Sequence, residues 1–289
     1  MTDSKDQFPY PLTTTDWLAA ELGAEDLKII DASWRMPGNP PAIEDHLQRR
    51  IPGAVFFDLD AIADKSTGLP HMLASEADFA AKIGALGVSE KDHIVVYDDA
   101  GLFSAARVWW NFRTMGHDAV AVLDGGLPKW LREERAVETG RAAPAPARYS
   151  VRSTRPMVKS ASDVREALSK NSSVVLDARP AARFSGETKE PRPGLRSGHM
   201  PGAVNLPHSM LMGDTGELKS LQELATLFHA RGVHAQTPVI TTCGSGVTAS
   251  VLALALERLG HRAHAVYDGS WTEWGDQAND PELFPVVAG

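Results

Sequence analysis

The residue of this 289-residue chain that is best suited to chemistry is Cys243, the only cysteine. An apolar, β-branched run over 238–242 stops at this residue, and a short loop of glycine and serine then opens into a helical pattern that ends at Gly260. This order predicts a strand, a tight loop and the start of a helix. Gly244 and Gly246 tolerate positive φ, so they allow successive backbone N–H groups of the loop to turn inward.

A ring of N–H groups at the positive end of a helix favours an anion. A sulfur atom held there is favoured as the thiolate, the form that acts as a nucleophile. The loop therefore predicts an activated sulfur nucleophile at Cys243. The alternative interpretation is a small buried hydrophobic residue at the end of a strand. The flanking glycines and the start of a helix favour the chemical interpretation.

The chain contains one structural unit twice. A strand-like run that ends at Asp31 resembles one that ends at Asp177, and the Pro-Gly-Ala-Val turn at 52–55 returns at 201–204. Two further pairs share one separation of 144 residues: Gly-His at 116 and at 260, and Asp-Gly at 124 and at 268.

Within each copy, short β-rich runs alternate with amphipathic helical patterns, which predicts a mainly parallel sheet with helices on both faces. The expected fold class is therefore α/β, with two similar domains. We expect an N-terminal domain over 1–140, a linker over 141–157 and a C-terminal domain over 158–289. The linker segment is rich in Ala, Pro and Arg and shows no periodicity.

The separation of 144 residues places Asp99 at the position that corresponds to Cys243. A carboxylate does not take up a sulfur atom as a thiolate does. We therefore expect the first domain to be a non-catalytic copy and the second domain to carry the nucleophile.

Serine residues mark the expected helix starts. Ser220 is followed by Glu223, which predicts a capping box, and Ser160 with Asp163 is a weaker version. Ser75 is expected to play the same part in the first copy.

Composition narrows the class of protein. A formal net charge of −8 argues against a nucleic-acid partner or an anionic membrane surface. No apolar run approaches the ~20 residues of a membrane span, and the first residues do not form a secretory signal. A single cysteine allows no intrachain disulfide, so we expect a cytoplasmic protein. His261 and His264 have no third ligand type nearby and no nucleotide fingerprint occurs, so we expect no metal and no cofactor.

The duplicated unit, the Tyr-Asp-Gly-Ser-Trp run at 267–271 and above all the loop Cys-Gly-Ser-Gly-Val-Thr-Ala at 243–249 resemble the tandem-domain rhodanese-type sulfurtransferases. The resemblance extends from about Trp17 to Trp274. Members that use thiosulfate typically carry two basic residues in this loop, and the form without them is associated with 3-mercaptopyruvate. The resemblance implies transfer of sulfane sulfur from 3-mercaptopyruvate to a thiol or cyanide through a persulfide on Cys243, with release of pyruvate. By family analogy, thioredoxin is the candidate thiol acceptor.

The resemblance also implies residues that bind the substrate. Arg183 and Arg192, in a segment rich in Gly and Pro, match the two arginines that the family uses to hold the carboxylate and keto oxygen. An arginine suits a carboxylate because it donates two parallel hydrogen bonds. The persulfide anion is expected to be stabilised by the backbone N–H groups of Gly244, Ser245, Gly246, Val247 and Thr248.

A proton relay is implied in the same way. Ser245, His71 and Asp60 match the family's proposed relay, in which the aspartate orients the imidazole. Alternatively, Ser245 only donates a hydrogen bond to the persulfide, and the sequence does not separate the two roles.

Three other functions use parts of the same pattern. A cysteine-dependent phosphatase needs an arginine six residues after the cysteine, where this chain has Ala249. A thiosulfate sulfurtransferase is disfavoured by Gly244 and Ser245, which stand at loop positions where basic residues are expected. A non-catalytic persulfide carrier is disfavoured by the loop around Cys243 together with the candidate arginines.

Overall fold

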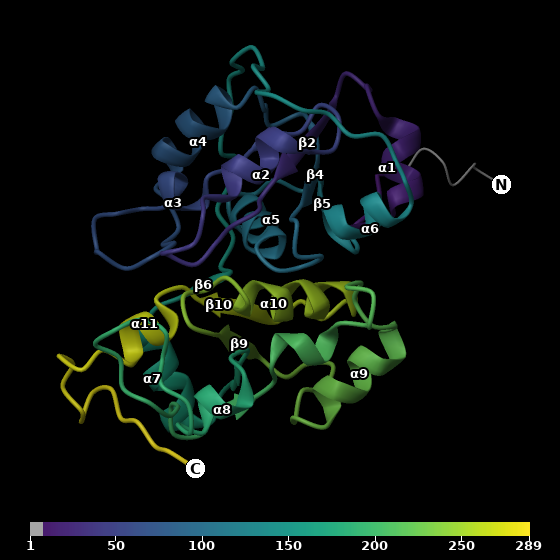
Figure 1. Ribbon diagram of the computed structural model, residues 1–289. Coiled ribbons are helices and arrows are strands. Elements are labelled where there is room, and N and C mark those ends of the chain that lie inside the picture. The colour runs from purple at the N-terminus through teal and green to yellow at the C-terminus, as the bar shows by residue number, and fades with distance from the viewer. Residues whose placement is uncertain (1–7) are drawn as a thin grey trace. The chain divides into compact units, whose positions relative to one another are not determined.

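The structure is a computed structural model that describes residues 8–289 (Figure 1). The contacts divide the chain into two compact units. The first unit contains the chain up to Ile62, Ser75–Thr154 and Asp214–Glu217, and the second contains Ala63–Ala74, Arg155–Gly213 and Leu218–Gly289. Ala63–Ala74 therefore belongs to the second unit although it lies in the first half of the sequence, and Asp214–Glu217 belongs to the first unit although it lies in the second half. The linear boundaries expected at 140 and 158 stay a prediction.

The first unit is built on a parallel sheet of five strands in the order β1-β5-β4-β2-β3. Its strands are β1 (Leu12–Thr13), β2 (Leu27–Asp31), β3 (Val55–Phe56), β4 (His93–Tyr97) and β5 (Val120–Leu123). Its helices are α1 (Thr15–Glu21), α2 (Ala42–Gln48), α3 (Leu59–Ile62), α4 (Glu76–Ala85), α5 (Ala105–Thr114) and α6 (Gly126–Arg132).

The second unit repeats this topology, with the parallel order β6-β10-β9-β7-β8. Its strands are β6 (Val158–Lys159), β7 (Val174–Asp177), β8 (Val204–Asn205), β9 (Val239–Thr242) and β10 (His264–Tyr267). Its helices are α7 (Ala161–Lys170), α8 (Ala181–Phe184), the 3-10 helix η1 (His208–Leu211), α9 (Leu221–His229), α10 (Ala249–Arg258) and α11 (Ser270–Trp274). The prediction of two similar α/β units with parallel sheets is confirmed.

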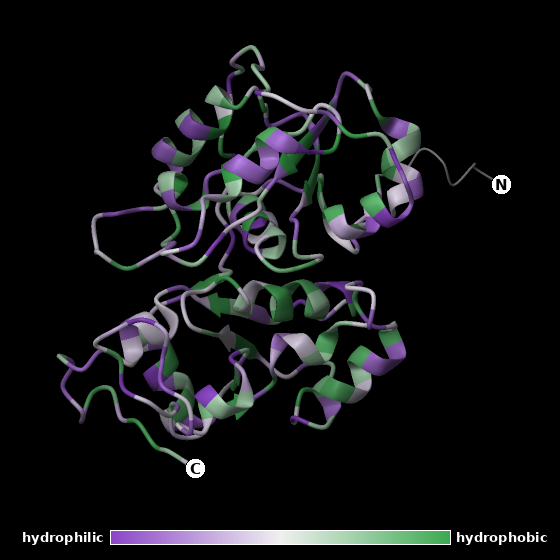
Figure 2. Ribbon diagram, viewed as in Figure 1, coloured by the Kyte–Doolittle hydropathy of each residue, from purple (hydrophilic) through white to green (hydrophobic). Residues whose placement is uncertain are grey.

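The central strands are buried because both faces of a parallel sheet are covered. Ile94–Tyr97 of β4 and Val239–Thr242 of β9 are buried, as their β-branched composition predicts. The helix that follows β9, α10, is buried from Ala249 to Glu257, and its ribbon is mostly green and white along its length (Figure 2). A helix that is apolar on nearly all sides is a core helix rather than a surface helix.

The helix starts carry the expected caps. Ser160 and Ser220 each form a reciprocal capping box with the residue three positions on, and the Ser75 side chain accepts from the Asp78 N–H. These caps satisfy N–H groups that a helix leaves unpaired at its first turn. The capping predictions are confirmed.

Gly84 allows helix α4 to lie very close to the segment around Ala147, which follows α6 in the chain. Gly84 lies in α4, and its carbonyl accepts the Ala147 N–H at 2.8 Å. A Cβ at Gly84 would lie 2.5 Å from the Ala147 carbonyl oxygen, a distance at which the backbone must move.

We therefore expect Gly84→Ala to lower the free energy of unfolding by about 1–3 kcal/mol, measured by urea denaturation. Helix propensity alone favours alanine by about 1 kcal/mol, so the sign of the change separates the two effects. Ala81→Gly, at an exposed position of the same helix, measures the propensity effect without the contact. A stabilised Gly84→Ala variant would contradict the close approach.

Candidate active site

Cys243 lies directly after β9, at the carboxyl end of the middle strand of the second sheet. This edge of a parallel α/β sheet is where such folds place their sites. Its thiol is free, and the residue is 2% exposed. The cysteine loop, which we define as residues 243–248, connects β9 to α10.

The start of α11 holds this loop in place. The Trp271 N–H donates to the Cys243 carbonyl at 2.9 Å, and the Thr272 N–H donates to the Gly244 carbonyl at 2.9 Å. The Cys243 N–H in turn donates to the Ser270 hydroxyl at 3.4 Å. Ser270 has φ 50°, in the left-handed region that non-glycine residues seldom adopt. The run at 267–271, which carries part of the family resemblance, therefore fixes the backbone of the nucleophile.

The N–H groups of Gly244, Ser245, Gly246, Val247 and Thr248 have no acceptor among the residues that the structure describes. Most of this loop is buried, and a buried N–H without an acceptor costs about 1–3 kcal/mol. Gly246 has φ 79°, as expected for a loop that turns its amides inward. An anion bound at this loop would satisfy these donors.

The corresponding loop of the first unit is already filled by an internal anion. The Asp98 carboxylate accepts the N–H groups of Ala100, Phe103 and Ala105 at 3.0, 2.7 and 2.8 Å. Asp98 is fully buried, and desolvation raises the pKa of its carboxyl in spite of these bonds. The separation of 144 residues places Thr242, a neutral residue, at this position in the second unit.

Asp99, the counterpart of Cys243, is also engaged. Arg35 donates to both of its carboxylate oxygens, one at 2.8 Å, and also to Asp45 at 2.9 Å. The hydrogen bond to Asp99 raises the pKa of Arg35 above its usual value. These residues line a cavity of about 610 Å³, and the ion pair leaves no free nucleophile in it. This geometry supports a non-catalytic first copy.

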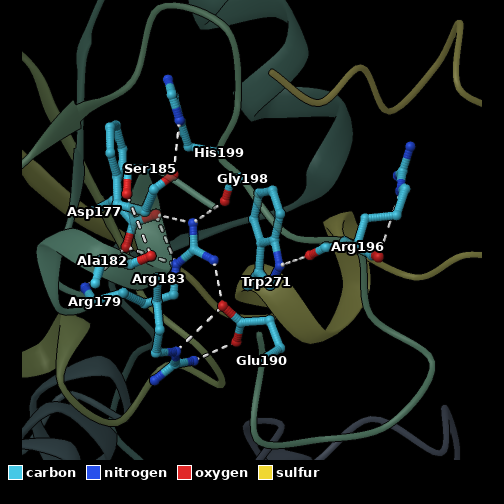
Figure 3. A network of polar contacts seen from close by, with 12 residues as sticks. Asp177, Arg179, Ala182, Arg183, Ser185, Glu190, Arg196, Gly198, His199 and Trp271 are labelled. Atoms are coloured by element: carbon cyan, nitrogen blue, oxygen red, sulfur yellow. Dashed lines mark hydrogen bonds and ion pairs between the residues drawn. The ribbon is translucent and has the colours of Figure 1, made fainter. Parts of the chain in front are cut away.

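Arg183 reaches the cysteine loop from α8. Its Nη2 lies 3.2 Å from the position that a Cβ would occupy on Gly244, so the guanidinium rests against the loop backbone. Its side chain is 22% exposed and is paired with the Glu190 carboxylate (Figure 3). Arg192 lies in the same loop, two residues beyond Glu190, and is partly buried. The substrate-binding roles of both arginines stay predictions.

Two members of the expected relay meet. His71 Nδ1 lies 3.0 Å from the Ser245 hydroxyl, and the two residues are 3% and 6% exposed. His71 belongs to the segment Ala63–Ala74, which is part of the second unit. Its φ of 62° is a left-handed conformation, which the surroundings must stabilise.

The Asp268 carboxylate supplies part of that support by accepting the Leu73 N–H at 2.8 Å. Asp60, the third expected member, lies in α3 of the first unit, where its carboxylate accepts the Trp34 indole N–H at 2.9 Å. Its role toward His71 stays a prediction.

Glu190, Arg179 and Asp268 are parts of the site that were not predicted from the sequence. Glu190 lies between the two candidate arginines in a loop already recognised as functional, and that spacing was the available signal. Asp177, the residue at which the repeated strand-like run ends, pairs with the buried Arg179. Among residues 8–289 we find no helix with the length and hydropathy of a membrane span and no cluster of three metal-ligating side chains.

Comparisons with known proteins agree with this geometry. A family model for the rhodanese-like domain matches residues 14–133 and 160–277. The 3-mercaptopyruvate sulfurtransferase of Escherichia coli K12 is 43% identical over 92% of this chain and 95% of its own length. The mitochondrial thiosulfate/3-mercaptopyruvate sulfurtransferase 1 of Arabidopsis thaliana is 41% identical over 94% of this chain and 77% of its own.

Among solved structures, the crystal structure of SseA from Escherichia coli, described as a 3-mercaptopyruvate sulfotransferase, superposes with a TM-score of 0.82. It is 41% identical and covers 90% of this chain and 98% of its own. The resemblance expected from the cysteine loop and the repeat is confirmed. This chain belongs to the rhodanese-like family and carries one rhodanese-like domain in each half.

Proposed function

We propose that this protein is a sulfurtransferase that moves sulfane sulfur from 3-mercaptopyruvate to a thiol or cyanide through a persulfide on Cys243, and releases pyruvate. The observation that carries the proposal is the free thiol of Cys243 at the start of a loop whose N–H groups have no acceptor in the described protein. Relatives over 40% identical along most of the chain support the same activity.

The first half-reaction is a displacement at sulfur. The Cys243 thiolate attacks the substrate sulfur, a new S–S bond forms, and the C–S bond breaks with its electron pair on carbon 3 of the departing enolate. The substrate thiol loses one proton, and carbon 3 gains one to give pyruvate. The negative charge that remains on the persulfide then lies beside the N–H groups of the cysteine loop.

A proton therefore has to travel from the substrate sulfur to carbon 3. Ser245 and His71, with their side-chain atoms 3.0 Å apart, are the pair that we propose for this transfer. Asp60 is proposed to orient the imidazole. In the second half-reaction, an acceptor thiol attacks the outer sulfur of the persulfide and regenerates the Cys243 thiolate.

The choice of donor is supported by the space beside Gly244. Because Arg183 Nη2 lies 3.2 Å from the Cβ position of Gly244, any side chain there would compete with this arginine for the same space. A loop with basic residues suits thiosulfate, a compact dianion. A neutral loop with Arg183 beside it, and Arg192 in the adjoining segment, suits a donor whose single carboxylate is distant from its sulfur.

The acceptor and the location are further proposals. We propose a thiol as the acceptor, with thioredoxin as the candidate, and a cytoplasmic location. The single cysteine, which allows no intrachain disulfide, supports the location, and the choice of thioredoxin rests on family analogy.

We expect the purified protein to use 3-mercaptopyruvate with a higher kcat/KM than thiosulfate, by about tenfold or more. Pyruvate is measured by coupling to lactate dehydrogenase, and thiosulfate use is measured as thiocyanate formed from cyanide. A preference for thiosulfate would overturn the assignment of the donor.

We expect Cys243→Ser to lower turnover by at least about a thousandfold, because the nucleophile is lost while size and polarity are nearly kept. Mass spectrometry of the wild type after 3-mercaptopyruvate should show one added sulfur, about 32 Da, on Cys243. Pyruvate released only once per chain would instead indicate a persulfide carrier.

We expect Arg183→Ala to lower kcat/KM for 3-mercaptopyruvate by about 30- to 160-fold, mainly by raising KM, since charge-assisted hydrogen bonds contribute about 2–3 kcal/mol. Lys189→Ala removes an exposed cation from the same loop and serves as the control. Equal kinetics for the two variants would show that Arg183 does not bind the donor.

A further inference from the structure

A buried carboxylate links the substrate-side arginine to the core of the second unit. Glu190 has a side chain only 1% exposed, and both of its oxygens accept from arginines. Oε1 accepts from Arg179 Nη1 at 2.8 Å and from Arg183 Nε at 3.2 Å, while Oε2 accepts from Arg183 Nη2 (Figure 3). A carboxylate so deeply buried is stable only when it is paired.

Arg179 holds the Glu190 carboxylate in place. Its guanidinium donates to both Asp177 oxygens at 2.7–3.1 Å and to the Gly198 carbonyl at 2.9 Å. It also lies 4.0 Å from the ring centre of Trp271. Burial alone would lower the pKa of Arg179, but the neighbouring carboxylates Asp177 and Glu190 outweigh it and raise the pKa. Arg179 is therefore a permanent cation, and Glu190 is held in place independently of Arg183.

Asp177, which binds Arg179, lies at the same edge of the sheet as Cys243. Asp177 ends β7 and is in register with Thr242, the residue before Cys243. The chain of contacts therefore runs from Asp177 through Arg179 and Glu190 to Arg183, which rests on the Gly244 backbone. These contacts fix the position of the Arg183 guanidinium relative to the cysteine loop.

The charges of this cluster balance. Arg179 and Arg183 are two cations, and Asp177 and Glu190 are two anions. Arg183 uses two of the five N–H donors of an arginine on Glu190, and three remain without an acceptor among the described residues. Arg183 can therefore donate directed hydrogen bonds to the substrate that supplies the sulfur, while the cluster around it carries little net positive charge.

From these contacts we infer that Glu190 is a positioning residue that holds Arg183 against the cysteine loop and cancels its charge, so that the site selects a monoanionic carboxylate donor over a dianion. The inference rests on the proposed function, and it adds a source of donor selectivity outside the loop itself. Loss of the Glu190 charge strengthens Coulomb attraction twice as much for a dianion as for a monoanion. Loss of its hydrogen bonds frees Arg183 and weakens bidentate binding of a carboxylate.

The test measures kcat/KM for 3-mercaptopyruvate and for thiosulfate on one preparation of each variant, so that their ratio does not depend on the fraction of folded enzyme. Glu190→Gln, which keeps the shape and removes the charge, should lower this ratio by about tenfold or more, with a raised KM for 3-mercaptopyruvate and little change in kcat. Glu187→Gln makes the same change at an exposed position of the same loop and should leave the ratio unchanged.

A double-variant cycle separates positioning from general structural support. In an Arg183→Ala background, Glu190→Gln should produce a clearly smaller fall in the ratio, because only the loss of the Glu190 charge then acts and the positioning of Arg183 no longer contributes. An unchanged ratio in Glu190→Gln, or an equal fall in the Arg183→Ala background, would overturn the inference.

Should Glu190→Gln fail to fold, Glu190→Asp keeps the charge one methylene further back. It should raise KM for 3-mercaptopyruvate without any gain in thiosulfate use, and an unchanged KM would overturn the inference. A wild type that prefers thiosulfate would instead refute the proposed donor, whereas the effect of Glu190 on the ratio would still be measurable.

Discussion

The main constraint on this molecule is a set of backbone N–H groups, those of residues 244–248, that have no acceptor within the described protein. Because most of this loop is buried, these donors are directed at a small enclosed region in which an anion would accept from them. A persulfide on Cys243 is such an anion, and it forms at the first residue of the loop. These N–H groups therefore stabilise the charge that the proposed reaction creates.

The two halves of the chain show how a few side chains decide whether the N–H groups of such a loop are available to a ligand. In the first unit, the Asp98 carboxylate accepts three N–H groups of its own loop, and the site is occupied from within. Thr242 stands at the corresponding position of the second unit and brings no charge. Asp99, at the cysteine position, is paired with Arg35. The two copies therefore differ in a few side chains at one sheet edge: these pair N–H groups of the loop in the first unit and leave those of the cysteine loop available in the second.

A single tryptophan connects the nucleophile to the binding side of the site. The Trp271 N–H fixes the Cys243 carbonyl, and its ring packs against the guanidinium of Arg179. Arg179 in turn orients Glu190, and Glu190 orients Arg183. Sulfur, backbone donors and arginine are therefore positioned by one connected set of contacts, which is what a displacement at sulfur requires of its geometry.

The sequence by itself determined what depends on neighbours along the chain. The α/β alternation, the duplication, the capping serines and the strand-loop-helix order around Cys243 are local patterns, and each was predicted. Only the tertiary structure decided the contacts between distant segments. His71 lies beside Ser245 across 174 residues of sequence, and the Trp271 N–H donates to the Cys243 carbonyl. Glu190 is near its arginines in sequence, but its burial and its sharing between them depend on the path of an irregular loop, which no period encodes.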